Sequence, residues 1–497
     1  MKAIRLSFIS LALVALLSGC ASSSFDTSSQ ATGSYATSQY EIVPDGDWPT
    51  SPLNEVTTLD FYSINDFHGA VAYNPSSYEL GINRLATYFD VKKGLNPDGT
   101  VILAAGDIWQ GSADSNITHG RLVTDAMNLI GFDAMAIGNH EFDWGEDTIR
   151  SNRDRSDFPL LSSNIFDRRS GQLADFALPY TLIDRSGVRI GIIGTIGATL
   201  ESSILTSNVM NFDFVPMRPL VESGAAYLRT LGAKAIVLLN HNGEVDSGVL
   251  DDVDVVFNAH THENYKYLTS GTPVLQASYN GKAVGHVRMT YTASSDQLEL
   301  VSYTVDSSLI GQSLAEQEGM KSLYDGYLDT EINVIKNEVL GTATASFSKA
   351  QLGNLAVAEM LAYGATMGAV AAFHNIGGVR DTISSGTVTY GDIYKVFPFD
   401  NELMIVEVSG TQLKWWLNQD NYVAGANPTS NTVGGTAIKD SQTYKIIAIN
   451  YLTEKHITST DQYPHNLNTA VNTFQYVREL IKAKWQSVGS LNPSNYN

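Results

Sequence analysis

AMAIGNHEFD, residues 134–143, joins a short apolar run to side chains that can bind metal ions and move protons. The run AMAI predicts a buried strand, because a short apolar segment bounded by turn-forming residues is typical of such strands. Asn139, His140, Glu141 and Asp143 follow the run at once. The segment therefore predicts a chemical site directly behind a strand.

Four further segments between residues 56 and 312 repeat this arrangement. Residues 65–69 follow FYSI, 106–107 follow VILAA, 240–241 follow AIVLL, and 260–262 follow VVFNA. The buried strands expected in this region are 57–64, 100–105, 134–137, 188–193, 235–239 and 253–258, and the strands that alternate like antiparallel ones are 274–277, 285–291 and 298–305. Because helical stretches separate the earlier strands, we expect a layered α/β domain over residues 56–312.

The polar side chains of these segments suit a centre that holds two divalent metal ions. Cations about 3.5–4 Å apart repel each other, so such a centre needs a carboxylate that bridges them, and Asp107 is the natural bridge. One ion would be held by Asp66, His68 and His262, and the other by Asn139, His241 and His260. These oxygen and nitrogen donors suit Mn, Zn, Co or Fe and do not select among them.

His140 is expected to act on the substrate rather than on a metal ion. It lies beside Asn139, so a protonated imidazole there would stabilise developing negative charge or donate a proton to the leaving oxygen. Asp143 follows three residues later and would orient that imidazole, as a carboxylate orients the histidine of a triad. His140 and Asp143 are therefore the predicted catalytic residues.

The order of the motifs, D-x-H, G-D, G-N-H-E-x-D, N-H and H-T-H, resembles the metallophosphoesterase signature. NDFHG at 65–69 and GNHEFDWG at 138–145 are similar to the 5'-nucleotidase family, which also includes UDP-sugar hydrolases and 2',3'-cyclic-nucleotide phosphodiesterases. The resemblance implies a four-layered α/β/β/α metallophosphatase domain followed by a smaller α+β C-terminal domain that binds the nucleoside. Two departures from the family are Ala259, where Gly is usual, and His262, where some branches have Gln or Asn.

Residues 341–497 are expected to form the substrate-binding domain, after a linker helix over 313–340. The predicted elements are a helix at 353–367, strands at 369–376, 402–409 and 443–450, a polar loop at 425–435 and a final helix at 469–487. By resemblance to the family, the substrate-binding residues would be Asn375, Gly377, Gly378, Arg380, Phe399 and Tyr451. The family's G-G-D-G-Y segment does not follow YKIIAIN, so phosphoryl chemistry is better supported than nucleotide specificity.

The first residues are typical of a bacterial lipoprotein signal. Lys2 and Arg5 precede a mostly apolar run over 6–17, which is shorter than the roughly 20 residues of a membrane span. Leu17-Ser18-Gly19-Cys20 then predicts a signal peptide over 1–19, acylation of Cys20, and a flexible tether over 20–55 at the outer membrane of the cell envelope. An ordinary secretory signal is the alternative. Cys20 is the only cysteine, which excludes a disulfide within the chain and a thiolate zinc site.

Composition and charge limit the class of function. Hydrophobic residues make up 43% and charged residues 17% of the 497, which is enough to bury sizeable cores. The formal net charge is −21, so binding to a nucleic-acid polymer is not expected. We therefore predict a lipid-anchored phosphoesterase that hydrolyses nucleotides to nucleoside and phosphate. The alternatives are a 2',3'-cyclic-nucleotide phosphodiesterase, a UDP-sugar hydrolase, or a non-catalytic surface protein that binds nucleotides. No oligomeric state follows from the sequence.

Overall fold

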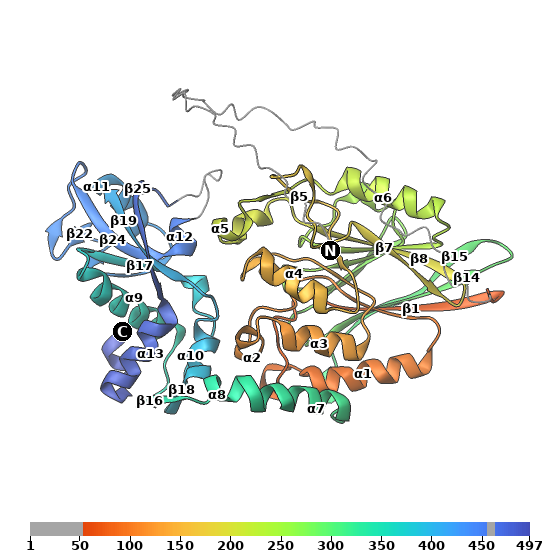
Figure 1. The fold of residues 1–497 in the computed structure, drawn as a ribbon, viewed down its shortest axis with the longest axis horizontal. Coiled ribbons are helices and arrows are strands. Elements are labelled where there is room, and N and C mark those ends of the chain that lie inside the picture. Colours follow the sequence, from red (N-terminus) through yellow and green to blue (C-terminus); the bar gives the residue numbers. More distant parts are fainter. Residues whose placement is uncertain (1–52, 455–462) are drawn as a thin grey trace, which may run out of the picture. The chain divides into compact units, whose positions relative to one another are not determined.

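Two six-stranded sheets form the centre of the N-terminal domain (Figure 1). The computed structural model describes residues 53–454 and 463–497, which belong to one compact unit, Tyr40–Asn497. The strand order of the first sheet is β15 (Gln297–Asp306), β14 (Val284–Thr292), β1 (Val56–Ile64), β2 (Thr100–Ala104), β3 (Ala134–Ala136) and β4 (Leu160–Leu161). The strand order of the second sheet is β12 (Asn264–Thr269), β13 (Thr272–Ala277), β11 (Val255–Asn258), β10 (Ala235–His241), β8 (Val188–Ile196) and β7 (Tyr180–Arg185).

Parallel strands make up most of each sheet. β1 to β4 are parallel to one another, whereas β14 and β15 continue the first sheet in antiparallel fashion. In the second sheet β8, β10, β11 and β13 are parallel, and β7 and β12 pair antiparallel at the two edges. The alternation at 274–277 predicts an antiparallel strand, but β13 pairs that way with β12 only and is parallel to β11.

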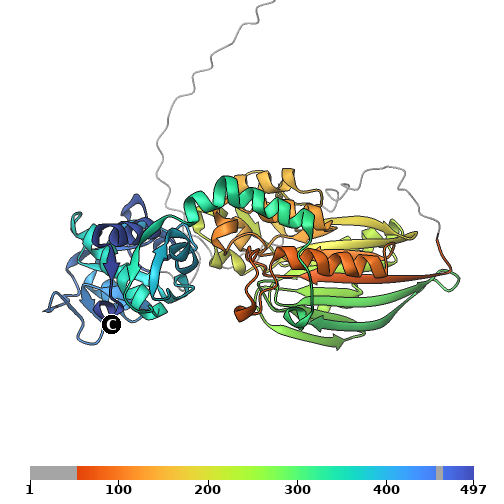
Figure 2. The ribbon, with the colours of Figure 1, turned by 90° about the horizontal axis from the view of Figure 1, so that it is seen from below.

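Side chains of β1 alternate between two different cores. Leu59 and Phe61 pack between the two sheets, whereas Tyr62 and Ile64 pack against helices outside the first sheet. The helices that cover the outer faces are α1 (Ile82–Leu95), α3 (Arg121–Ile130) and α4 (Glu146–Arg155) on the first sheet and α6 (Arg218–Thr230) on the second. Figure 2 shows α1, in orange, lying along the strands on the side from which that view is taken. The four-layered α/β/β/α sandwich implied by the family resemblance is thus confirmed.

An almost continuous helical segment leads out of the sandwich. α7 (Glu318–Tyr327), a π-helical turn (Leu328–Ile332) and α8 (Asn333–Lys336) follow one another without a break, within the stretch where a linker helix is expected. Met320 and Ile332 are buried against the helical side of the first sheet. The linker therefore packs on the N-terminal domain through α7 and the π-helical turn.

A five-stranded sheet forms the centre of the C-terminal domain. Its strand order is β20 (Asn421–Ala424), β17 (Ala371–Asn375), β24 (Thr443–Ile449), β19 (Glu402–Ser409) and β25 (Asn466–Tyr476). The helices of this domain include α9 (Lys349–Ala365), α10 (Tyr390–Val396), α11 (Gly410–Leu417) and α13 (Val477–Val488). Ser348 and Gln351 form a capping box, which explains why α9 begins before the predicted residue 353. Phe373, Trp416 and Trp485 are fully buried in the core between helices and sheet.

The predicted final helix at 469–487 is wrong in its first half. Residues up to Tyr476 belong to β25, which pairs antiparallel with β19, and only Val477–Val488 is helical. The sequence NLNTAVNTFQY has little helical amphipathicity, and a distant strand supplies its hydrogen-bonding partner. The polar loop at 425–435 also contains two short paired strands, Ala426–Asn427 and Thr432–Val433.

The predicted signal peptide, Cys20 and most of the tether lie outside the described residues. Within residues 53–454 and 463–497, no helix combines the length and apolar character needed to cross a membrane.

Candidate dinuclear metal site

The predicted metal ligands meet where five parallel strands of the two sheets end. Asp66 and His68 follow β1, Asp107 follows β2, and Asn139 follows β3, whereas the ligands of the second sheet come from the end of β10 and the loop after β11. Two groups of three side chains have their ligand atoms within 4.8 Å of one another: Asp66, His68 and His262, and Asp107, His241 and His260. Residues far apart in the sequence thus meet at one edge of the sandwich.

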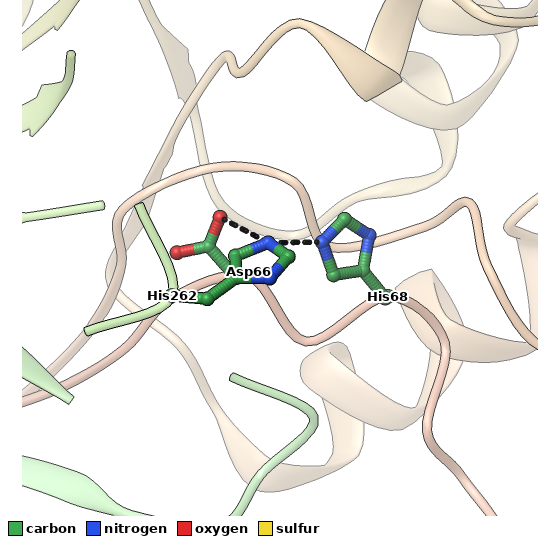
Figure 3. Close-up of side chains that lie close together, drawn as sticks. All are labelled: Asp66, His68 and His262. Carbon is green, nitrogen blue, oxygen red and sulfur yellow. Dashed lines mark hydrogen bonds and ion pairs between the residues drawn. The ribbon is translucent and has the colours of Figure 1, made fainter. Parts of the chain in front are cut away.

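In the first group His262 lies between Asp66 and His68 (Figure 3). Its Nε2 is 3.0 Å from Nε2 of His68 and 3.5 Å from Oδ1 of Asp66. The Nδ1 of His68 is 2.9 Å from the carbonyl oxygen of Gln110, so Nδ1 carries the proton and Nε2 presents its lone pair. Burial lowers the pKa of His68 to about 3, which keeps the ring neutral and able to bind a metal ion.

The second group contains Asp107 and also has Asn139 within it. Nε2 of His241 is 3.2 Å from Oδ2 of Asp107 and 3.2 Å from Oδ1 of Asn139, and Nδ1 of His260 is 3.0 Å from the same Asn139 oxygen. The Nδ1 of His241 faces the carbonyl oxygen of Ala105 at 2.8 Å. Burial would lower the pKa of His241, but the Asp107 carboxylate outweighs it and raises the pKa to about 9. Without a metal ion, Nε2 of His241 would hold a proton toward these oxygens, and a metal ion can take the place of that proton.

These contacts test whether the residues suit metal ions. In the first group two imidazole nitrogens face each other at 3.0 Å, and in the second a nitrogen oriented by a carbonyl faces two oxygens. Lone pairs at such distances repel unless a cation lies between them. The donors are nitrogen and oxygen only, which suits Mn, Zn, Co or Fe. The residues fit a two-ion centre, in which Asp107 lies beside His241 and the backbone N–H of His68 donates to the Asp107 carbonyl.

The backbone at this edge is held in an unusual conformation. The residues with positive φ here are Asp66 (48°), His68 (49°), Asp107 (55°), His260 (83°) and His262 (61°). Such angles are uncommon for residues other than Gly and persist only where the surroundings enforce them. Backbone hydrogen bonds do so here, because N–H of Asp66 donates to Gly106 and N–H of His68 donates to Asp107.

Glu141 ties two of the ligand-bearing loops together. Its fully buried carboxylate accepts hydrogen bonds from the backbone N–H of Asp107 (2.9 Å), Ile108 (2.8 Å) and Gly138 (2.7 Å). Glu141 belongs to the G-N-H-E-x-D motif, but the sequence alone assigns it no role. The available signal was a charged residue directly beside ligands in a segment expected to be buried.

His140 and Asp143 form the predicted pair. Nδ1 of His140 lies 2.8 Å from Oδ2 of Asp143, and the backbone N–H of His140 donates to Oδ1 of Asp107 at 2.8 Å. Burial would lower the pKa of His140, but the charges of Asp143 and Asp107 outweigh it and raise the pKa to about 9. The ring is thus fixed beside the metal ligands, with Nδ1 occupied and Nε2 available.

A cavity beside His140 gathers most of the predicted substrate-binding residues. Its walls include Asn139, His140, His260, Asn375, Gly377, Arg380, Phe399 and Tyr451. The guanidinium of Arg380 lies 5.5 Å from the centre of the Phe399 ring, and that ring is 5.9 Å from the His140 ring at 27°. The Oδ1 of Asn375 is buried with no hydrogen-bond partner among the described residues. Gly378 does not line the cavity, because it packs against His374 and Asn375.

The loop that carries Phe399 is held from two sides by residues that the sequence analysis did not identify. Arg478, at the start of α13, donates to the carbonyl oxygens of Phe397 (3.0 Å) and Phe399 (2.8 Å). Asn116 donates to the carbonyl oxygen of Pro398 between them, at 2.8 Å. Three successive carbonyls are thus fixed, which fixes the direction of the aromatic ring. No local sequence signal marks Arg478, because its partners lie in a distant loop.

Comparisons with known proteins agree with this arrangement. A family model for the 5'-nucleotidase C-terminal domain matches residues 331–432. The endonuclease YhcR of Bacillus subtilis is 27% identical over 489 aligned positions, covering 89% of this chain, and the chain spans only 38% of that protein's length. A 5'-nucleotidase of Vibrio parahaemolyticus is 27% identical, with 82% of this chain and 79% of that protein covered. The structure of a 5'-nucleotidase precursor from Thermus thermophilus matches with a TM-score of 0.69 at 20% identity, over 88% of this chain and 97% of that one.

The sandwich fold is that of solved 5'-nucleotidase structures, and the paired clusters behind its strands are consistent with a dinuclear metal site. Residues 331–432 match the 5'-nucleotidase C-terminal domain, and the chain as a whole is similar to 5'-nucleotidases in sequence and in fold.

Proposed function

We propose that this protein hydrolyses a nucleoside monophosphate to nucleoside and phosphate with the help of two divalent metal ions. The observation that carries the proposal is the shared cavity, whose walls combine Asn139 and His260 from the metal ligands with Arg380 and Phe399. A phosphate group there would meet the metal ligands and the guanidinium, while a planar base would lie on an aromatic ring.

Each residue of the cavity then has a distinct task. Two divalent ions, when bound, supply Lewis acidity and a water molecule of lowered pKa. Arg380 binds phosphate oxygens, and His140, oriented by Asp143, presents Nε2 to the phosphoryl group or the leaving oxygen. Phe399 and Tyr451 bind the base by stacking. No residue is assigned to the ribose, because the segment that the family uses for it is absent from the sequence.

The test is a panel of esters offered to a purified chain of residues 21–497. Phosphate release is measured from 5'- and 3'-mononucleotides, ATP and an aryl phosphate, each with Mn, Zn, Co or a chelator. For 2',3'-cyclic nucleotides, UDP-glucose and single-stranded DNA, an added phosphatase releases phosphate from the products; DNA is included because one relative is named an endonuclease. His140→Ala is assayed beside the unaltered chain. We expect chelator-sensitive release that is fastest from a 5'-mononucleotide and lost in the variant.

Other outcomes separate the alternatives. Release from the aryl phosphate alone would support phosphoesterase activity but show that the substrate is not a nucleotide. Faster turnover of the cyclic nucleotide or DNA would show that the substrate is a phosphodiester. Faster turnover of UDP-glucose would show that it is a pyrophosphate instead of the proposed monoester. Bound metal without turnover of any ester would favour a surface protein that binds nucleotides.

We also propose that acylation of Cys20 anchors the protein to the outer membrane of a bacterial cell envelope. The support is the sequence alone, in which Lys2, Arg5 and an apolar run precede Leu17-Ser18-Gly19-Cys20. Expressed from residue 1 in a bacterium, the chain should enter the membrane fraction and incorporate labelled fatty acid. Cys20→Ala should abolish both. Labelling that persists in the variant would refute the anchor.

A further inference from the structure

His262 differs from His68 and His241 in how its ring is oriented. A histidine that binds metal usually donates its second ring N–H to a carbonyl or carboxylate, which fixes the ring. His68 and His241 do so, with Nδ1 at 2.9 Å from Gln110 O and 2.8 Å from Ala105 O. For His262, the described residues provide no carbonyl at its Nδ1, and its side chain is 32% exposed. Another contact must therefore hold this ring.

That contact is the ring of Tyr279. The two rings are stacked, with centroids 4.9 Å apart and planes 21° apart. The ammonium of Lys282 also lies over the Tyr279 ring, 3.6 Å from the ring centre, which is well inside the range of a cation–π contact. Tyr279 thus contacts both Lys282 and His262, and Nε2 of His262 is the nitrogen that faces His68 and Asp66 in Figure 3.

The backbone on both sides of Tyr279 is fixed to the two segments that carry the first ligand group. N–H of Ser278 donates to the carbonyl of Glu263 at 2.9 Å, next to His262, and Asn65 donates to the carbonyl of Ser278 at 2.7 Å. N–H of Asn280 donates to the carbonyl of Asp66 at 2.7 Å. Tyr279 is therefore rigidly placed against the ligands of one ion and contacts none of the second group in the described structure.

We propose that Tyr279 is a positioning residue that holds His262 in its metal-binding orientation and thereby sets the affinity of the Asp66–His68–His262 site. The inference concerns metal binding, so it stands whichever ester the protein hydrolyses. An ion bound at that site gains from a ring that is already oriented, because less side-chain freedom is lost on binding. Removing the stack should weaken this site and leave the Asp107–His241–His260 site unchanged.

The experiment compares Tyr279→Leu, Tyr279→Phe and a matched control, Tyr267→Leu. Tyr267 is also a partly exposed tyrosine stacked on a ring, Tyr265, at 5.6 Å, but it touches no ligand. The chain of residues 21–497 is freed of metal with a chelator and titrated with Co²⁺. Visible absorption and calorimetry then give the number of ions bound and the Kd of each, and melting temperatures check the fold.

Tyr279→Leu should raise the Kd of one of the two sites by about 10-fold or more, the size of effect seen for residues that orient metal ligands. Tyr279→Phe keeps the stacked ring and should restore the affinity, and Tyr267→Leu should not differ from the unaltered chain. Unchanged affinities in Tyr279→Leu would overturn the proposal. Failure of Tyr279→Phe to restore binding would overturn it as well, because the hydroxyl and not the stack would then be responsible.

The proposed function and this inference fail in different ways. If no ester is hydrolysed but Tyr279→Leu weakens one ion, the function is wrong and the positioning role stands. If a nucleotide is hydrolysed and Tyr279→Leu binds both ions normally, the proposed function stands and the positioning role is wrong.

Discussion

Asp143→Asn removes the charge that holds His140 in place. Nδ1 of His140 and Oδ2 of Asp143 are 2.8 Å apart, and both side chains are only 17% exposed, so water screens the pair weakly. A hydrogen bond to a charged group contributes about 1.5–3 kcal/mol. Because 1.36 kcal/mol corresponds to tenfold in rate, losing this bond in the transition state should lower kcat by about 10- to 150-fold.

The assay measures kcat and KM with the preferred ester and counts bound metal by mass spectrometry. Asp143 belongs to neither ligand group, so both ions should remain and KM should change little. Asp147→Asn is the matched control, since its carboxylate is 99% exposed and pairs only with Arg150 among the contacts of the described structure. An unchanged kcat in Asp143→Asn with both ions bound would refute the positioning of His140. A loss of metal would show instead that Asp143 supports the ligands.

Three further changes have defined outcomes. Phe399→Ala should raise KM for a nucleotide by about 5- to 150-fold, because stacking on a base contributes about 1–3 kcal/mol, and should leave KM for a small phosphate ester without a base nearly unchanged in the same kinetic assay. Chelation should lower the melting temperature, since an ion present at about 100 times its Kd stabilises the fold by about 2.7 kcal/mol, and a scan with and without chelator measures this. Asp60→Asn should destabilise the sandwich by about 1.5–3 kcal/mol at pH 7. Although burial alone would raise it, hydrogen bonds from His286, Arg288 and Asn96 hold the pKa of Asp60 well below its usual range, so the stability it provides is present above the unfolded pKa and is lost as pH falls below about 4. Urea unfolding of both forms at pH 7 and pH 3 should show the difference shrinking in acid.

The fold of the N-terminal domain could be predicted because each buried strand is specified by residues that are neighbours in the sequence. Each ligand-bearing segment follows an apolar run that fills a buried parallel strand, as AMAI does before GNHEFD. The edge strands β7 and β12 were not predicted, since their partly exposed sequences lack such runs. The helix predicted at 469–487 failed for the same reason, because β25 is defined by its pairing with β19.

The site was predictable in its ligands but not in the residues that hold them. Histidines and carboxylates behind strands carry a chemical signal in the sequence itself. Glu141, Arg478 and Tyr279 act on loops that approach them only in the folded chain. Their roles depend on which backbone groups come within reach, and a single sequence does not encode that in any local pattern.

The positive φ angles of five ligand residues have a consequence for how such a site survives mutation. Each non-glycine residue in this conformation costs about 1 kcal/mol or more, so Asp66, His68, Asp107, His260 and His262 occupy backbone positions at which glycine would be more stable. Replacing one of these ligands by glycine would then relieve backbone strain while destroying the centre, so the stability of the chain and the integrity of the site make opposite demands at these positions.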